Sequence, residues 1–585
     1  MSVPDTRSLP IVFQQPGLLA GGGLNKAITR TALGGLYTQA WQLNNIYPTV
    51  LGFSNKGEEE DYGIGVSPII TGTVATGKVQ GIAVYDEDLI FVKNGRVYKV
   101  PMAGGNETEI TGGSPIFDTS ARIRFEQAYG TVSIVKKKLL YMADSSGLNL
   151  PQYYDGNSLT EMTVFAGDLF QLSFGIPVGM VNWLNRLVWF FHKNNDYRNY
   201  ILSSDFDDAN LYSENNGSSQ AFYTDIYPGE QDYIRGLSVI KRSGSDIETQ
   251  ELIVYKLSNS YISGTRVIPG DSTPIKTFNR MSEIGAINHE CIVNFNNNVY
   301  SMSRQGIGNF DAATTSGGIY AFSYQDGARI NPLIQLSARN NNFDQAFSLH
   351  CPERQLIVFS MPETLETSAT KNGYPYPEAP NDLSIGFRYG VNVKGGEEVV
   401  NCWFTMKGMG WGWSCGCVNE KNVFWGDYIE GQIYKWFSGT EFQRNPSQPE
   451  TEVPFTSRYE TGDMVLETPE TMYKNLLELI LNWYVATGIE SRVTIFYDGK
   501  EEGQGLTYNL NFGGEAATYG TAVYGTSLYS YETVVSLRCA PSDGGRKVRI
   551  KIEWNSKTLA NKDNLAALDS FIGTVQYGKR LMGVY

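Results

Sequence analysis

A short strand-like motif recurs along this chain and constrains its fold more than any other feature. The segment GRVYK at residues 95–99 returns as GQIYK at 431–435 and, less completely, as GIY at 318–320. Each copy precedes a turn of small residues, and similar apolar runs lie between the copies at intervals of roughly 45 to 65 residues, as four-stranded units with insertions would give. One such sheet cannot bury both of its faces, so several must stack around an axis. We therefore predict a β-propeller over residues 76–445 with about six to eight blades; a pair of β-sandwiches is the alternative.

Local patterns also favour strands over helices. Two β-rich runs within residues 88–100 flank an Asn-Gly pair, which is typical of a tight hairpin turn. Apolar and charged residues alternate over 548–554, as expected for a half-buried strand. The segment 472–485 fits a helix or a long strand, and its strict alternation favours the strand. Residues 561–571 are a candidate for one short helix. The predicted fold class is all-β.

Composition changes along the chain suggest three parts. Residues 1–75 are glycine-rich and irregular and are expected to form an N-terminal arm or β region. The propeller at 76–445 contains a long polar excursion at 361–398, which we expect to be an exposed loop. A proline-containing linker then leads into residues 446–585, which are rich in strands and long enough for a β-sandwich-like platform domain.

Charge and cysteine content narrow the class of protein. The chain carries 47 Lys plus Arg and 61 Asp plus Glu, a formal net charge of −14, so nonspecific coating of nucleic acid is not expected. With only 18% charged and 13% aromatic residues, the chain is not disordered. No secretory signal pattern or membrane-length apolar run is evident, so we expect synthesis in the cytoplasm without a membrane segment. Reduced thiols are expected at all six cysteines: Cys291, Cys351, Cys402, Cys415, Cys417 and Cys539.

Candidate metal sites are weak. Cys415 and Cys417 are separated by one residue, which is too close for the usual zinc pair, and Cys402 does not complete a second pair. The acidic run at 205–208 resembles the start of a calcium loop but lacks the glycine and the closing glutamate that such a loop requires. We therefore expect no metal and no cofactor.

Catalytic motifs are equally weak. The three histidines, His192, His289 and His350, lie in strand-like contexts, and His192 is expected to mark a strand end rather than a catalytic base. There is no Gly-x-Ser-x-Gly elbow and no phosphate-binding P-loop. A pair of glycosidase carboxylates cannot be chosen among 61 acidic residues. We name no catalytic residue and expect that the protein is not an enzyme.

A tryptophan-rich stretch gives the one signal for carbohydrate. Within GMGWGW at 408–413, an exposed Trp411 or Trp413 would stack on a sugar ring, as in a carbohydrate-binding or glycan-cleaving propeller. The favoured interpretation is a blade strand whose glycines let neighbouring backbone approach closely.

The C-terminal third resembles a known family. In order, six segments carry the resemblance: 453–463, 474–479, 493–499, the glycine-punctuated 518–525, the basic strand 546–554, and 575–580. Together they resemble the tail nozzle proteins of short-tailed bacteriophages, which include tail tubular protein B and the tail stabilisation proteins. The blade-like centre and the glycine-rich N-terminal segment fit the same family, so the similarity covers most of the chain.

The resemblance implies a virion tail protein that is made in the host cytoplasm. It implies a ring of six copies that lies below the head–tail adaptor, extends and gates the DNA channel, and anchors fibres or spikes. Duplex DNA would pass without sequence-specific binding. The net charge of −14 suits this role, because an acidic wall repels phosphates over roughly 8 Å at physiological salt, although an acidic surface also simply favours solubility. The other hypotheses are the carbohydrate-binding or glycan-cleaving propeller and a scaffold propeller that recruits proteins.

Overall fold

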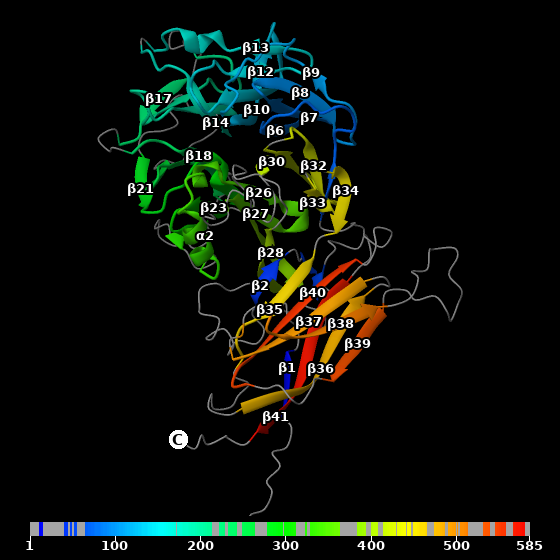
Figure 1. Ribbon diagram of the computed structural model, residues 1–585. Coiled ribbons are helices and arrows are strands. Elements are labelled where there is room, and N and C mark those ends of the chain that lie inside the picture. The colour runs from blue at the N-terminus through cyan, green and yellow to red at the C-terminus, as the bar shows by residue number, and fades with distance from the viewer. Residues whose placement is uncertain are drawn as a thin grey trace, which may run out of the picture.

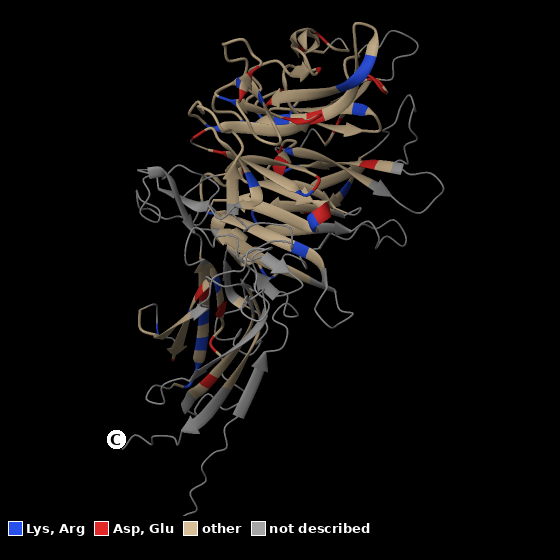
Figure 2. Cartoon of the chain, turned by 90° about the vertical axis from the view of Figure 1, so that its right-hand side faces the viewer, with Lys and Arg blue, Asp and Glu red and all other residues tan. Residues whose placement is uncertain are grey.

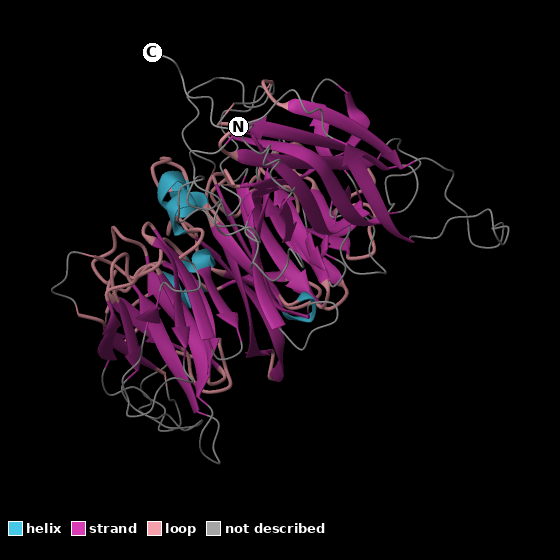
Figure 3. Cartoon of the chain, turned by 90° about the horizontal axis from the view of Figure 1, so that it is seen from below, coloured by secondary structure: helices cyan, strands magenta, loops and turns pink. Residues whose placement is uncertain are grey.

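The chain folds almost entirely into strands. The computed structural model describes residues 11–15, 40–44, 47–49, 52–54 and, with interruptions, 65–578; the longest interruptions are 264–277, 312–321, 363–382, 513–530 and 557–565. Antiparallel sheets of four strands follow one another along the chain, and Figure 3 shows how few helices accompany them. The all-β prediction is confirmed, as is the propeller.

Seven blades can be counted in the described part of the chain, and the first four run in sequence order. Blade 1 consists of β6 (Val79–Tyr85), β7 (Asp88–Lys93), β8 (Arg96–Pro101) and β9 (Thr108–Glu109). Blade 2 consists of β10 (Ile123–Val132), β11 (Val135–Asp144), β12 (Gln152–Tyr154) and β13 (Leu159–Glu161). Blade 3 consists of β14 (Pro177–Trp183), β15 (Arg186–Phe191), β16 (Tyr200–Ser203) and β17 (Phe222–Asp225). Blade 4 consists of β18 (Gly236–Arg242), β19 (Thr249–Tyr255), β20 (Ser260–Ser263) and β21 (Phe278–Ser282).

The remaining blades include the one that closes the ring. Blade 5 consists of β22 (Ile292–Phe295), β23 (Asn298–Ser303), β24 (Gly306–Asp311) and β25 (Phe322–Ser323). Blade 6 consists of β26 (Phe347–Cys351), β27 (Leu356–Met361), β28 (Leu383–Asn392) and β29 (Val399–Lys407). Blade 7 consists of β30 (Trp413–Asn419), β31 (Asn422–Asp427), β32 (Ile433–Gly439) and, from the N-terminal segment, β5 (Gly65–Pro68). The helical elements are short: η2 (Thr163–Ala166), η3 (His289–Cys291), α2 (Asn331–Ser337), η4 (Phe343–Gln345) and η5 (Pro352–Arg354).

Strand β5 closes the propeller by pairing antiparallel with β32. The buried side chain of Gln432 reinforces this closure: its Oε1 accepts a hydrogen bond from the Ile70 amide at 3.0 Å, and its Nε2 donates to the Ile70 carbonyl at 2.9 Å. The propeller therefore starts at Gly65, earlier than the boundary that we expected at residue 76, and it joins its last blade to a strand more than 360 residues away.

The first strand of each blade lines the axis. Each of β6, β10, β14, β18, β22, β26 and β30 contacts the next, and β30 contacts β6. Space at the axis is so tight that a Cβ on Gly81 would come within 2.2 Å of the Ile123 carbonyl oxygen. Between neighbouring blades lie apolar layers; the layer between blades 2 and 3 includes Tyr141, Phe165 and Trp189. Each large side chain buried in such a layer contributes roughly 1.5–3 kcal/mol before entropy is subtracted.

The platform is a sandwich of two sheets below the propeller (Figure 1). One face contains β35 (Ser457–Thr461), β40 (Val548–Ser556), β37 (Ile489–Tyr497) and β38 (Leu506–Phe512). The other contains β3 (Tyr47–Thr49), β4 (Gly52–Ser54), β41 (Ala566–Gly578), β36 (Tyr473–Val485), β39 (Tyr531–Arg538) and β1 (Ile11–Gln15). The two sheets pack against each other where the ring of Trp483, on β36, meets the ring of Trp554, on β40, edge to face; the ring centroids are 5.2 Å apart.

A single nine-stranded sheet connects the propeller and the platform. Strand β2 (Ala40–Asn44) lies between β29 of blade 6 and β35 of the platform and pairs with both. Strands β33 (Glu441–Asn445) and β34 (Gln448–Pro454) extend the sheet of blade 7. The residues that we expected to form an N-terminal arm thus supply strands to both domains.

Three local expectations can now be compared with the structure. Within the segment 472–485, the described residues 473–485 form the long strand β36, as predicted. The helix considered at 561–571 is wrong for its described residues, because they begin strand β41, which pairs with β36 along its length. Within the excursion at 361–398, residues 383–392 form β28 of blade 6, and most of the rest lies outside the described residues.

Charged residues of both signs are interspersed along the propeller strands (Figure 2). None of the helices in the described ranges has the length and apolar character needed to cross a membrane.

Candidate functional site

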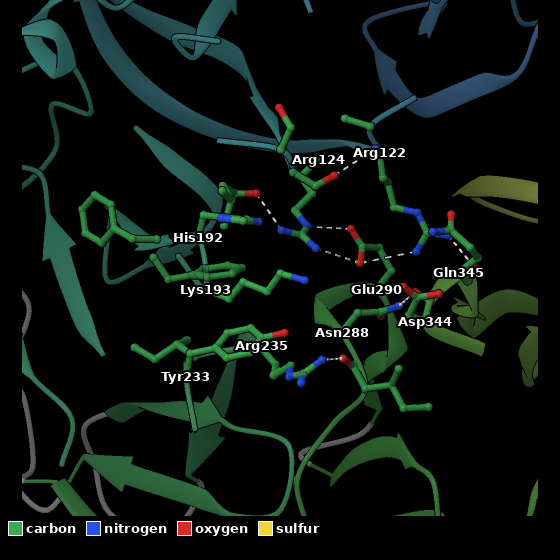
Figure 4. Close-up of a pocket in the computed structure, with 18 of the residues that line it drawn as sticks. Arg122, Arg124, His192, Lys193, Tyr233, Arg235, Asn288, Glu290, Asp344 and Gln345 are labelled. Carbon is green, nitrogen blue, oxygen red and sulfur yellow. Dashed lines mark hydrogen bonds and ion pairs between the residues drawn. The ribbon is translucent and has the colours of Figure 1, made fainter. Parts of the chain in front are cut away.

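A cluster of charged side chains lies on the propeller axis (Figure 4). Glu290, in η3 before blade 5, faces two arginines from the start of blade 2. Its Oε1 lies 2.6 Å from Arg124 Nε, and its Oε2 lies 3.4 Å from Arg122 Nη1. The residues come from chain positions 166 apart, and the ring of blades brings them together.

Main-chain carbonyls fix both arginines. Arg122 donates to the carbonyls of Ala346 at 3.1 Å, Ser414 at 3.1 Å and Gln345, and Arg124 donates to the Val178 carbonyl at 2.7 Å. The guanidiniums are therefore positioned by blades 3, 6 and 7 as well as by Glu290.

The two arginines also control the charge of Glu290. Burial alone would raise the pKa of this carboxyl, but the guanidiniums of Arg124 and Arg122 outweigh burial and hold the pKa well below its usual range. Glu290 is therefore ionised at neutral pH, and the cluster of one carboxylate and two guanidiniums carries a net positive charge.

The cluster borders two cavities. The larger has a volume of about 490 Å³, and the smaller, of about 230 Å³, shares Arg122, Arg124 and Glu290 in its lining. The larger volume falls within the range of small-molecule sites, roughly 300–1,000 Å³. The ionic cluster therefore forms part of the wall of both cavities.

The lining of the larger cavity has an excess of positive charge. Four cationic side chains line it, Arg122, Arg124, Lys193 and Arg235, against two carboxylates, Glu290 and Asp344.

Lys193 and Arg235 have no carboxylate partner among the described residues. Arg235 donates from Nη1 to the Ile287 carbonyl at 3.3 Å and lies 4.3 Å from the ring centroid of Tyr233, while its buried Nε has no hydrogen-bond partner in the described part of the chain. Lys193 extends its ammonium group into the cavity (Figure 4).

A further lysine lies behind the cluster. The Nζ of Lys78 donates to the Ser120 carbonyl at 3.3 Å and to Gln345 Oε1 at 3.4 Å. Burial and, after it, the nearby charge of Arg122 lower the pKa of Lys78 to about 8.

The three histidines occupy different positions. His192 follows β15, as predicted for a strand end, but it also lines the larger cavity; burial, then the charges of Lys193 and Arg124, lower its pKa. His289 accepts a hydrogen bond from the Leu237 amide at Nδ1, 3.2 Å away, and burial lowers its pKa to about 4.

His350, on β26, lies away from this group. Its Nε2 is 2.9 Å from the hydroxyl of Tyr389, and burial lowers its pKa. The three histidines therefore do not form one site.

The candidate metal ligands have structural roles in the described residues. Burial raises the pKa of Cys415 to about 11 and also raises the pKa values of Cys417 and Cys402. In the acidic run at 205–208, Asp208 accepts from the Thr131 amide at 3.1 Å and Asp207 pairs with a lysine on blade 2. No group of three or more His, Cys, Asp or Glu residues in the described ranges is arranged to hold a metal. Cys539 lies outside the described residues.

Trp413 is the tryptophan of the GMGWGW stretch that the structure describes. Trp413 begins β30, is 2% exposed and stacks on Trp425 with ring centroids 5.5 Å apart. The prediction of a packed blade strand is confirmed for Trp413, so this ring cannot bind a sugar at the surface. Trp411 lies outside the described residues.

Sequence reasoning did not identify the axial residues. A signal was present: charged residues such as Arg122, Arg124 and Arg235 stand just before or within the first strand of a blade, and first strands converge on the axis. Using that signal requires the blade boundaries, which the irregular repeat does not supply.

Comparisons with known proteins support the fold only. No family model matches the chain, and no curated protein matches it. Solved structures similar to it include the computationally designed Ika8 protein, at 9% identity and a TM-score of 0.33, covering 63% of this chain and 99% of that one. A glycoside hydrolase family 43 arabinoxylan arabinofuranohydrolase from Bacillus subtilis matches at 10% identity and a TM-score of 0.22, covering 87% and 97%. A mutant Trypanosoma rangeli sialidase matches at 9% identity and a TM-score of 0.25, covering 90% and 96%.

Two of these similar structures are named as enzymes, a glycoside hydrolase and a sialidase. This finding overturns our expectation that the chain is not an enzyme, because the expectation rested on missing motifs and chains of similar fold include enzymes. At identities near 10%, the likeness extends to the fold and assigns no activity.

Proposed function

We propose that this protein is a structural subunit of the tail of a short-tailed bacteriophage. In this proposal, copies assemble as a ring below the head–tail adaptor, extend and gate the channel through which DNA leaves the head, and anchor fibres or spikes. The protein is made in the host cytoplasm and ends in the virion tail. The proposal starts from the resemblance of the C-terminal segments to tail nozzle proteins.

The observation that carries the proposal is the sheet shared by the two domains. Domains joined only by a linker move relative to one another by default, whereas here β2 pairs with β35 of the platform over Ala40–Asn44 and meets β29 of blade 6 at one residue pair, Asn44 with Thr405. A wall element under load requires such a rigid connection between its layers.

The platform also offers surfaces for association. Strands β38 and β39 end the order of their sheets among the described strands, and both lie on the right-hand side of the platform in Figure 1. An edge strand presents backbone donors and acceptors that another chain can pair with. A ring needs two complementary surfaces on each copy, and these edges would supply one of the two.

One exposed residue supports a contact role on the propeller. Ile134, in the turn between β10 and β11, has a positive φ of 72° and a side chain that is 96% exposed. A left-handed conformation costs a β-branched residue roughly 1–2 kcal/mol, and an exposed isoleucine gains nothing from burial. A contact made only in the assembly accounts for both features.

The test is the state of association. Purified protein, alone and mixed with the adaptor ring, is examined by native mass spectrometry and analytical ultracentrifugation. A closed oligomer, six copies by the resemblance, is the expected species in at least one of the two samples. Protein that stays monomeric in both samples contradicts the proposal.

The proposed passage of DNA gives a second prediction, that the assembled protein does not bind duplex DNA. A wall with a formal net charge of −14 per copy should not retain duplex DNA. In an electrophoretic mobility assay at about 50 mM salt, assembled protein is expected to leave duplex DNA unshifted. Micromolar binding that weakens steeply with salt would contradict a neutral or acidic channel.

The axial cavity favours one other function, that of a binding propeller for a small ligand such as a sugar. The burial of Trp413 removes one of the two rings on which that hypothesis rested. Glycan-array binding by a monomeric protein would favour this alternative over the ring.

A further inference from the structure

We propose that the larger axial cavity is a binding site for a small oxyanion, a molecule that carries a phosphate or carboxylate group. Lys193 and Arg235 contact the anion directly, and the cluster of Arg122, Arg124 and Glu290 forms the charged wall behind it. This inference goes beyond the tail role and does not depend on it.

The distribution of charge is the first support. The whole chain has an excess of acidic residues, with a formal net charge of −14, yet the lining of this cavity has four cationic side chains and two carboxylates. Like charges gathered in a partly dehydrated space repel one another, and this repulsion weakens the fold unless an anion offsets it. A bound anion of charge −2 would neutralise the excess.

The second support is the unused capacity to donate hydrogen bonds. Arg235 is held in place by the Ile287 carbonyl and by the ring of Tyr233, and the bond to Ile287 is the only hydrogen bond that its guanidinium donates within the described part of the chain. A guanidinium carries five N–H donors, so donors remain for a bound anion. The ammonium of Lys193 adds further donors to the same cavity (Figure 4).

The third support is that the site is preorganised. Arg122 and Arg124 cannot swing away, because carbonyls of three other blades and Glu290 fix their guanidiniums. A fixed charged wall loses little side-chain entropy when the anion binds. The charged wall therefore needs no rearrangement when the anion binds.

Size and donor type define the ligand class. A volume of about 490 Å³ admits a small molecule and excludes a folded chain or a duplex. Guanidinium groups pair with carboxylate and phosphate in the same planar, two-point geometry, so the shared chemistry is an oxyanion. Separate probes distinguish the two sources.

The experiment is isothermal titration calorimetry on the full chain, with pyrophosphate as the phosphate probe and glucuronate as the carboxylate probe. Glucose and sodium chloride at matched ionic strength are the controls for the sugar body and for general screening. Lys193→Gln and Arg235→Gln remove the direct contacts and leave the fixed cluster intact. Lys99→Gln is the matched control, since Lys99 pairs with Asp88 on blade 1 and does not line the cavity.

Saturable binding of one probe or both is expected, weakened at least tenfold by each cavity variant and unchanged in Lys99→Gln. Binding of pyrophosphate alone identifies a phosphate ligand, and binding of glucuronate alone identifies a carboxylate ligand. Circular dichroism melting without anions checks that each variant is folded. The proposal is overturned if neither probe saturates the protein at millimolar concentration, or if folded Lys193→Gln and Arg235→Gln bind as tightly as the wild type.

Discussion

Replacing Glu290 by glutamine tests the electrostatics of the axis most sharply. The substitution keeps the size of the side chain and removes the one charge that compensates Arg122 and Arg124, whose side chains are 7% and 12% exposed. Removing one partner from a buried ion pair costs roughly 3–5 kcal/mol. Because Glu290 is 19% exposed to the cavity, we expect the lower end, about 3 kcal/mol.

The same substitution should strengthen anion binding, since it adds one net positive charge to the cavity. Differential scanning fluorimetry without anions is expected to show a melting temperature about 5 °C below that of the wild type. Pyrophosphate should then restore stability, and a ligand at a hundred times its dissociation constant contributes about 2.7 kcal/mol. The increase should exceed that of the wild type at equal concentration.

The matched control is Glu109→Gln. Glu109 pairs with Arg96 on the surface of blade 1 at 3.6 Å, and a surface pair of this kind contributes roughly 0–1 kcal/mol. The reasoning is refuted if Glu290→Gln melts at the wild-type temperature in anion-free buffer, or if pyrophosphate stabilises it no more than it stabilises the wild type.

Three further predictions concern the ring, its closure and its exposed turn. The pKa of His289 is about 4 in the fold and near 6.5 in the unfolded chain, so between these pH values the unfolded state binds more protons. The free energy of unfolding should therefore fall as the pH is lowered from about 6.5 to 4, by up to about 3 kcal/mol. His289→Asn keeps an acceptor for the Leu237 amide, and urea unfolding of this variant should show a smaller loss over the same pH range; an unchanged pH profile would assign the loss to other groups. Gln432→Ala removes both hydrogen bonds to Ile70 at the propeller closure, so it should lower the free energy of unfolding by about 2 kcal/mol and speed proteolysis near Gly65. Gln335→Ala, which loses one exposed hydrogen bond, is the control. Equal effects of the two substitutions would contradict a closing role for Gln432. Ile134→Asn removes the backbone strain of an isoleucine in the left-handed conformation, so it should raise the free energy of unfolding of the subunit by about 1 kcal/mol. The same variant should assemble into oligomers more weakly in analytical ultracentrifugation. A variant that assembles as the wild type does would show that Ile134 is not part of the contact.

The fold was predictable because its signals are local. The hairpin of blade 1 has positive φ at Asn94 and Gly95, 51° and 73°, as the Asn-Gly pair indicated. The alternation in 548–554 and 472–485 likewise became strands β40 and β36. The helix prediction for 561–571 was wrong because the secondary structure of a short segment of mixed composition depends on the strands beside it. Pairing with β36 makes its described residues a strand.

The seven blades fall within the range of about six to eight that the repeat indicated, but their exact number and the site were not predictable, for a shared reason. Blade 7 is completed by β5, and the axial cluster joins Arg124 to Glu290 across 166 residues. Nothing local to any of these residues records the partner. The closed ring determines both, so they emerge only once the blades are placed in order.

Electron microscopy of negatively stained particles tests the central claim, that this chain is a wall element of a ring, most directly. Images of the protein alone and mixed with the adaptor ring are expected to contain closed rings with a central hole wide enough for duplex DNA. Fields of separate propeller–platform particles in both samples, with no ring among them, would contradict it.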